Sequence, residues 1–250
     1  MMDIFEHYFD DVRQTLASGN LKDRTSISCF DPEITCSRGR RGEIILSSDM
    51  AIELGHPQTE SLAFLMWSDS PDRVRDGRIT VIGPELKELA YGKAPFGRII
   101  LVGTHGFTEE NAYDRFQEMD MIRIRICLPG YMLRAVPQQN REWSRISKQA
   151  LKEGLSLKML GNELVREYRN LEYVDAVEVI FITSSANDIR KFRPTGEKVS
   201  QITKAMNKIF DNLELDCAAC DFSEVCDEVE GLKDMHKRAR NNAGKSVATS

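Results

Sequence analysis

Apolar residues recur every fourth position at the start of the chain: Ile4, Tyr8, Val12 and Leu16. This spacing puts them on one side of a helix, and Gly19-Asn20 supplies a stop signal after it. Residues 21–42 show no comparable period and predict a loop with one short strand. Residues 1–42 are therefore predicted to form an N-terminal helix and loop.

The segment from Glu43 to Gly103 has a mostly β pattern. Its apolar runs are separated by glycine and proline, and they cover residues 43–46, 61–67, 78–82 and 98–102. Residues 108–118 then predict a helix. Residues 121–126 alternate isoleucine with arginine, which predicts a half-buried strand with a basic outer face.

The second half of the chain alternates predicted helices with one strong strand. The strand is expected at 174–182, where apolar residues dominate. Helices are expected at 144–153, 156–169, 187–211 with a break near Pro194, and 224–238; Gly154 is a C-cap between the first two. The fold class is α+β, with a mixed or antiparallel sheet, packed helices and a helical C-terminal extension that carries cysteines.

The sequence predicts four parts, the first of which is the helix and loop at 1–42. An α+β domain spans 43–195, a helical extension spans 196–238, and 239–250 is a disordered tail. The net charge of −5 makes nucleic-acid binding an unfavoured role. No secretory signal and no membrane-spanning apolar run is visible, so we expect a cytoplasmic protein without membrane contact.

Three of the six cysteines lie within ten residues: Cys217, Cys220 and Cys226. Thiolates at this spacing favour an iron–sulfur cluster or zinc over magnesium or calcium, and the cytoplasm disfavours a disulfide framework. A [4Fe–4S] cluster takes four thiolates, so a remote cysteine is required. We favour Cys36, with Cys29 and Cys127 as alternatives. Zinc completed by a cysteine, His236 or an aspartate is the structural alternative, and free thiols or a local disulfide is another.

A basic segment suits a nucleotide-like anion. Its candidate binding residues are Arg134, Arg141, Trp143, Arg145 and Lys148. Guanidinium groups bind phosphate through two parallel hydrogen bonds, and an indole ring stacks on a base or holds a cation. The alternative is that Trp143 and Ile146 pack a helix onto the sheet while the charges are solvated. No P-loop, dinucleotide fingerprint, GxSxG or HExxH motif occurs, and no catalytic residue is assigned.

Four segments stand in an order that resembles a known family. They are 49–58 (Asp-Met-Ala-Ile-Glu-Leu-Gly-His-Pro-Gln), 76–85 (Asp-Gly-Arg-Ile-Thr-Val-Ile-Gly-Pro-Glu), 95–97 (Pro-Phe-Gly) and 142–154. Over roughly residues 43–195 the chain resembles the middle domain of the acetyl-CoA synthase β subunit of carbon monoxide dehydrogenase/acetyl-CoA synthase complexes. That family condenses a methyl group, carbon monoxide and coenzyme A at a nickel site bridged to a [4Fe–4S] cluster.

The resemblance implies an α+β domain and a coenzyme A surface at Trp143 and Arg145, with Arg134, Arg141 and Lys148 beside them. The chain lacks the Cys-Gly-Cys pair that holds nickel in that family, so we expect the nickel chemistry to be absent. Whether the protein catalyses any reaction therefore stays open.

Two functions compete on these grounds. The first is an iron–sulfur accessory or redox protein of one-carbon metabolism in an anaerobe. It would bind coenzyme A, and its partners would be carbon monoxide dehydrogenase/acetyl-CoA synthase or corrinoid-protein subunits. The second is a non-catalytic interaction module with a structural zinc site.

Overall fold

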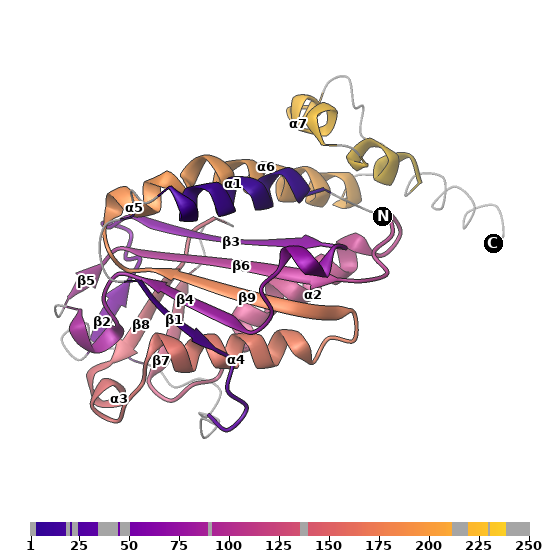
Figure 1. The fold of residues 1–250 in the computed structure, drawn as a ribbon. Coiled ribbons are helices and arrows are strands. Elements are labelled where there is room, and N and C mark those ends of the chain that lie inside the picture. Colours follow the sequence, from indigo (N-terminus) through magenta and orange to yellow (C-terminus); the bar gives the residue numbers. More distant parts are fainter. Residues whose placement is uncertain are drawn as a thin grey trace.

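The structure is a computed structural model of the chain (Figure 1). The residues it describes are 4–18, 21, 25–34, 45, 51–89, 92–135, 140–211, 220–229 and 231–238. The predicted ligands Cys36 and Cys217, the apolar run at 43–46 except Ile45, and the predicted tail at 239–250 lie outside these residues.

A five-stranded sheet forms the centre of the fold. Its strands are β1 (Thr25–Cys29), β3 (Ser61–Ser68), β4 (Arg78–Ile82), β6 (Phe96–Thr104) and β9 (Val174–Ile182). They lie in the order β1-β4-β9-β6-β3, with β4/β9 and β6/β3 parallel and the other neighbours antiparallel. Every residue of β3 and β6 is buried. Strands covered on both faces have continuous apolar runs, as the sequence shows here.

A second, four-stranded sheet lies beside one end of the first (Figure 1). Its strands are β2 (Ala51–Leu54), β5 (Lys93–Ala94), β7 (Tyr131–Ala135) and β8 (Trp143–Ser147), in the order β5-β2-β8-β7. β8 runs antiparallel to both β2 and β7, so the strand that begins at Trp143 has a hydrogen-bonded neighbour on each side. This position holds the predicted basic segment in an extended conformation.

Helices cover both faces of the five-stranded sheet. The helices of the described residues are α1 (Glu6–Ala17), α2 (Ala112–Arg125), α3 (Lys148–Lys152), α4 (Leu157–Arg169), α5 (Ala186–Lys191), α6 (Arg193–Asp211) and α7 (Ser223–Glu228), with a further helix at 232–238 and short 3-10 helices at Pro71–Arg73 and Leu86–Glu88. α3 packs against β8 of the four-stranded sheet, and α7 packs against α6. Figure 1 shows α1 and α6 along one face and α4 along the other. Within the described residues, no helix is long and apolar enough to cross a membrane.

Much of the predicted order is confirmed. The first helix, the strands at 78–82 and 174–182, and the helix at 156–169 coincide with α1, β4, β9 and α4 within two residues. The predicted break near Pro194 lies at Phe192, between α5 and α6. Gly154 has a φ of 98° and follows the end of α3, as predicted for a C-cap. The α+β fold class is therefore confirmed.

The strand predicted at 121–126 is wrong. These residues complete α2, whose buried side chains are Ala112, Phe116, Met119 and Ile122. That spacing of four and three residues follows a helical face, and it continues directly from the predicted helix before it. Ile124 is 55% exposed, so the alternation of isoleucine and arginine does not mark a buried face.

The helix predicted to begin at 144 is also wrong at its start. Residues Trp143–Ser147 form β8, and α3 begins at Lys148. Hydrogen bonding to β2 and β7 on both sides stabilises the extended conformation. The Ser147 hydroxyl then accepts a hydrogen bond from the Gln149 amide at 3.2 Å, which caps the new helix.

The predicted domain boundary at 195/196 falls inside α6. A Cβ atom added at Gly196 would lie 2.7 Å from Leu62 Cδ1 of β3, so α6 packs directly on the sheet there. The C-terminal end of the same helix leads toward α7 (Figure 1). One continuous helix therefore joins the sheet to the cysteine-bearing extension.

Candidate functional site

Trp143 lies at the centre of an aromatic and cationic surface. The guanidinium carbon of Arg134 in β7 is 4.9 Å from the centroid of the Trp143 ring. The His56 ring packs edge-on against the same indole, with centroids 5.1 Å apart. Trp143 is half-buried and Arg134 is exposed, so part of this surface faces solvent. The contact of arginine with indole contributes about 0.5–1 kcal/mol at an exposed site.

A polar pocket adjoins this surface. It has a volume of about 320 Å³, and its lining residues are Pro57, Gln58, Thr59, Glu60, Asn140, Arg141, Arg190 and Arg193. Three arginines face one carboxylate there, so the lining carries an excess of positive charge. Glu60 lies 3.0 Å from Arg190 Nε and also pairs with Arg193. An anion with several oxygens is the ligand class that fits such a lining.

Of the predicted residues, Trp143 and Arg134 are in contact, and Arg141 lines the polar pocket and donates to the Thr59 carbonyl at 3.3 Å. Arg145 and Lys148 are not part of the open surface. Arg145 is 8% exposed, and its Nε donates to Glu53 Oε1 at 2.6 Å while Nη1 donates to the Ile45 carbonyl at 2.8 Å. Lys148 is half-buried at the first position of α3. Arg145 therefore fixes β8 against β2 from within.

A second buried ion pair holds the residue before Trp143. Glu142 Oε2 lies 2.5 Å from Arg98 Nη2, and the two side chains are 0% and 4% exposed. Burial acts to lower the pKa of Arg98, but the charge of Glu142 outweighs it and the pKa is raised. The Ser61 hydroxyl also donates to the Glu142 carbonyl at 2.7 Å. The backbone that presents Trp143 is thus anchored to the five-stranded sheet.

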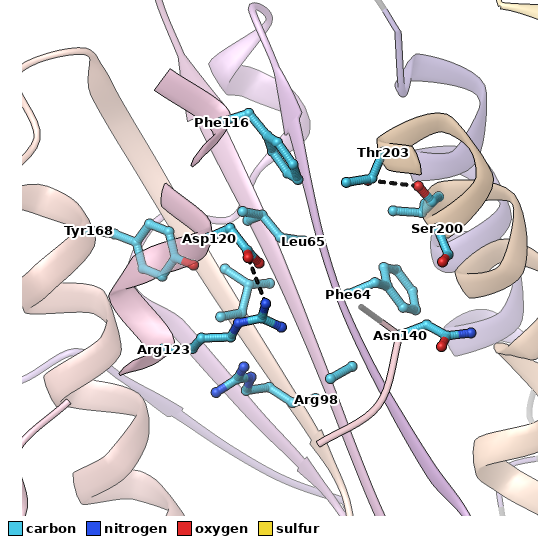
Figure 2. A pocket seen from close by; sticks show the side chains of 13 residues that line it. Phe64, Leu65, Arg98, Phe116, Asp120, Arg123, Asn140, Tyr168, Ser200 and Thr203 are labelled. Atoms are coloured by element: carbon cyan, nitrogen blue, oxygen red, sulfur yellow. Dashed lines mark hydrogen bonds and ion pairs between the residues drawn. The ribbon is translucent and has the colours of Figure 1, made fainter. Parts of the chain in front are cut away.

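Figure 2 shows a cavity lined by charged groups near this anchor. Arg98 extends from β6, while Asp120 and Arg123 come from α2 and bond to each other at 2.6 Å. Burial raises the pKa of Asp120, although Arg123 and Arg98 act in the opposite direction. The cavity volume is about 30 Å³. Since a water molecule needs about 10–15 Å³ on this measure, the cavity suits ordered water and is too small for a nucleotide.

Cys220 and Cys226 lie in a C-terminal lobe formed by residues 220–229 and 231–238, apart from the Trp143 surface (Figure 1). Cys220 and Cys226 line a cavity of about 300 Å³ between α6, α7 and the helix at 232–238, together with His236. Cys29 is exposed on β1, and Cys127 is half-buried after α2. Among the described residues, no three cysteine, histidine, aspartate or glutamate side chains are grouped closely enough to hold a metal ion. Cys217 and Cys36 lie outside that part of the chain.

The pocket arginines Arg190 and Arg193 and the carboxylate of Glu60 were not predicted as site residues. The two arginines follow Trp143 by about 50 residues, and Glu60 precedes it by about 80 residues. None of the three stands in a recognisable motif. Only the packing of α5 and α6 beside the loop at 55–60 brings them to Arg141. The sequence feature that could have indicated these residues is the close spacing of two arginines near the start of the helix predicted at 187–211.

Comparison with known proteins gives a consistent result. The model of the family described as CO dehydrogenase/acetyl-CoA synthase complex beta subunit matches residues 33–188. The acetyl-CoA decarbonylase/synthase complex subunit beta of Archaeoglobus fulgidus is 32% identical over 57% of this chain and 27% of its own length. The carbon monoxide dehydrogenase/acetyl-CoA synthase subunit alpha of Moorella thermoacetica is 30% identical over 68% of this chain and 23% of its own length.

A third relative, the acetyl-CoA decarbonylase/synthase complex subunit beta of Methanopyrus kandleri, is 30% identical over 62% of this chain and 33% of its own length. The chain therefore matches between about a quarter and a third of the length of these relatives. The matched segment contains both ion pairs and the Trp143 surface, and it ends before α6 begins. The chain belongs to the family of CO dehydrogenase/acetyl-CoA synthase complex beta subunits.

Proposed function

We propose that the protein is an accessory or redox protein of cytoplasmic one-carbon metabolism that binds coenzyme A at the Trp143 surface and an iron–sulfur cluster at its C-terminal cysteines. Its partners would be carbon monoxide dehydrogenase/acetyl-CoA synthase subunits or a corrinoid protein. The relatives named above are subunits of such complexes. The observation that supports the coenzyme A surface best is the contact of Trp143 with Arg134 beside a pocket lined by three arginines.

Coenzyme A has the chemical groups that this surface fits. Its adenine ring is a partner for the exposed part of the Trp143 indole, and its phosphates are partners for guanidinium groups. In this proposal Arg134 and Arg141 contact the ligand, while Arg145 positions β8 through Glu53. When bound, coenzyme A supplies a thiol that carries acyl groups. The residues of this chain bind and orient it.

Tryptophan fluorescence tests the proposal directly, because the chain has two tryptophans and Trp67 is 1% exposed in the core. Coenzyme A is expected to change the emission of the wild-type protein and not of Trp143→Phe. Arg134→Gln and Arg141→Gln are each expected to weaken binding about tenfold, which corresponds to about 1.4 kcal/mol. Arg115→Gln is the matched control, since Arg115 lies 4.7 Å from the centroid of the Tyr173 ring. No change at millimolar coenzyme A would exclude the proposed surface.

The metal is tested separately by metal and sulfide analysis with a visible spectrum, on anaerobically purified protein. The support for a metal at this place is that Cys220 and Cys226 line one cavity. About four irons and four sulfides per chain are expected. Both should be lost in Cys220→Ala. Ser223→Ala, at a polar residue that lines the same cavity, is the control for a change in the cavity wall and should retain the metal.

A second candidate is an interaction module with a structural zinc site. The observation that favours it is the imidazole of His236 in the same cavity as the two thiols, because zinc accepts mixed sulfur and nitrogen ligands. One zinc per chain and no sulfide would select this candidate over the iron–sulfur protein.

A further inference from the structure

We propose that a groove between α1 and the strands β1 and β4 binds an anionic amphiphile, a carboxylic acid with an apolar chain, through Arg75 and Arg78. The groove has a volume of about 780 Å³, which lies within the usual range of small-molecule sites. Among the described residues, it shares no lining side chain with the pocket beside Trp143 or with the cavity of the C-terminal lobe. The inference is therefore independent of the proposed function.

The floor of the groove is one face of the five-stranded sheet. β1 and β4 pair antiparallel, so that Thr25 lies opposite Ile82 and Ile27 lies opposite Thr80. Paired residues point to the same side of a sheet, and all four of these line the groove. Ile82 is 1% exposed, whereas Ile27 on the edge strand is 54% exposed. Ile27 is thus a large apolar side chain that faces solvent at the groove.

One end of the groove is apolar. Leu16 and Ala17 of α1 line it, and so does Leu21, which follows the helix. The chain then passes to Thr25, whose partner in β4 is Ile82. Methylene groups of a ligand that lie against these side chains are removed from water, which favours binding.

Two arginines of the groove are neutralised within the protein. Arg13 of α1 donates to both carboxylate oxygens of Glu178, at 2.8 and 2.6 Å. The buried Glu178 also accepts a hydrogen bond from the Arg75 amide at 3.1 Å. Arg73 forms ion pairs with two carboxylates of α1. These two guanidinium groups therefore have anionic partners before any ligand arrives.

The guanidinium groups of Arg75 and Arg78 remain available. Within the described part of the chain, neither forms an ion pair with a carboxylate. Arg78 Nε lies 3.5 Å from the Thr80 hydroxyl, which is a weak contact. The exposed Asp72 also lines the groove, so the lining has four arginines against three carboxylates. An excess of one positive charge favours a singly charged head, and a carboxylate offers two oxygens to guanidinium donors.

The strand register separates the charged end from the apolar end. Arg78 lies opposite Cys29 and Ile82 lies opposite Thr25, four positions further along β4. Four residues of strand correspond to about 13 Å. A small polar anion would leave the apolar end in water, and a neutral apolar molecule would leave the two arginines without an anion. A carboxylate with an acyl chain of medium length satisfies both ends.

Titration calorimetry on the full-length protein with decanoate, below the concentration at which it forms micelles, tests the proposal. Decanoate is expected to bind and to raise the unfolding temperature. Acetate has the charge without the chain, and decyltrimethylammonium has the chain with the opposite charge. Both are expected to bind at least about tenfold more weakly than decanoate, because each lacks one of the two kinds of contact.

Variants test the two ends of the groove separately. Arg75→Gln and Arg78→Gln are each expected to weaken decanoate binding about tenfold. Arg125→Gln, at an exposed arginine of α2 outside the groove, is the matched control and should bind as the wild type does. Ile27→Asn is expected to weaken binding, whereas Ile124→Asn is not. The two isoleucines are 54% and 55% exposed, so neither change disturbs a packed core.

Three outcomes would overturn the proposal. Decanoate that produces neither heat nor a rise in unfolding temperature would exclude the site. Equal binding of decanoate and decyltrimethylammonium would remove the role assigned to the arginines, and equal binding of decanoate and acetate would remove that of the apolar end. The proposed coenzyme A surface and metal site are measured by Trp143 fluorescence and metal analysis, so their success or failure is decided separately.

Discussion

Arg98 and Glu142 join the two sheets through an ion pair that is almost wholly buried, with 2.5 Å between Nη2 and Oε2. Arg98 belongs to β6 of the five-stranded sheet, and Glu142 immediately precedes β8 of the four-stranded sheet. Removal of one partner leaves an uncompensated charge in the interior, which is more costly than removal of both.

Arg98→Met is therefore expected to lower the free energy of unfolding by about 3–5 kcal/mol, measured by urea denaturation. The double variant Arg98→Met/Glu142→Gln is expected to recover a large part of that loss. Equal losses in the single and double variants would show that the pair acts through packing alone.

Gly55 is expected to tolerate no side chain. Its φ is 64°, and a Cβ atom would lie 2.1 Å from the Glu142 carbonyl oxygen and 2.7 Å from Ser61 Oγ. Gly154 has a φ of 98° with nothing within 4 Å of such an atom, so it is the matched control. We expect Gly154→Ala to cost about 1–2 kcal/mol and Gly55→Ala roughly 3 kcal/mol or more in chemical denaturation. Equal costs would show that close approach to Glu142 contributes nothing.

His56 is expected to stay neutral below its ordinary titration range. Burial, followed by the charge of Lys93, lowers its pKa from 6.5. Its Nδ1 accepts a hydrogen bond from the Gln58 amide at 3.0 Å, which protonation would break. Between the lowered pKa and 6.5 the unfolded chain binds a proton that the folded chain does not. Stability from this group is thus complete above pH 6.5 and falls as the pH drops.

An NMR titration of the imidazole protons measures this directly, and the midpoint of His56 should lie below 6.5. In His56→Gln the corresponding fall in the free energy of unfolding should be smaller than in the wild type. A midpoint at or above 6.5 would contradict the prediction.

Asp188 is expected to stabilise the start of α5 only while it is ionised. Burial acts to raise its pKa, but hydrogen bonds from Lys191, Ser184 and Ser185 outweigh this and lower it. The two hydroxyls donate to Oδ2 at 2.8 and 2.9 Å, and Lys191 Nζ donates to Oδ1 at 2.7 Å. Because the folded-state pKa is below 3.8, the contribution is present above that pH and is lost as the pH falls through the folded-state value.

Asp188→Asn should therefore cost about 2 kcal/mol at pH 7 and less under acid conditions, as measured by denaturation at several pH values. Asp175→Asn removes a carboxylate that is 37% exposed and paired with His105, so it should change stability much less. A cost for Asp188→Asn that is independent of pH would refute the role of its charge.

The sequence predicted an element most accurately where its apolar pattern was compatible with only one type of secondary structure. The nine residues of β9 are nearly all apolar and lie between β4 and β6, and they were predicted at their observed bounds. In α2 two periods overlapped, because Ile122 fits a helical face with Met119 and also alternates with Arg123. The buried partners on the sheet decide between them, and no local pattern contains that information.

The basic segment shows the same limit for the site. Trp143 and Arg145 were recognised as residue types, but their separation into an open surface and a buried anchor depends on Glu53, which lies about 90 residues earlier. The arginines at 190 and 193 join the pocket only through tertiary packing. The residue types could therefore indicate a binding surface in this segment. Which residues belong to it depends on tertiary packing.

The helix α6 separates the coenzyme A surface from the metal site of the proposed function. Arg193, at its first position, lines the pocket beside Trp143, and its far end leads to the cysteine lobe. Its 19 residues span about 28 Å. A ligand seated among the arginines and a metal among the cysteines would thus lie at opposite ends of one rigid rod, beyond bonding contact. Any transfer of a chemical group between them requires a long carrier arm or a second protein that reaches across.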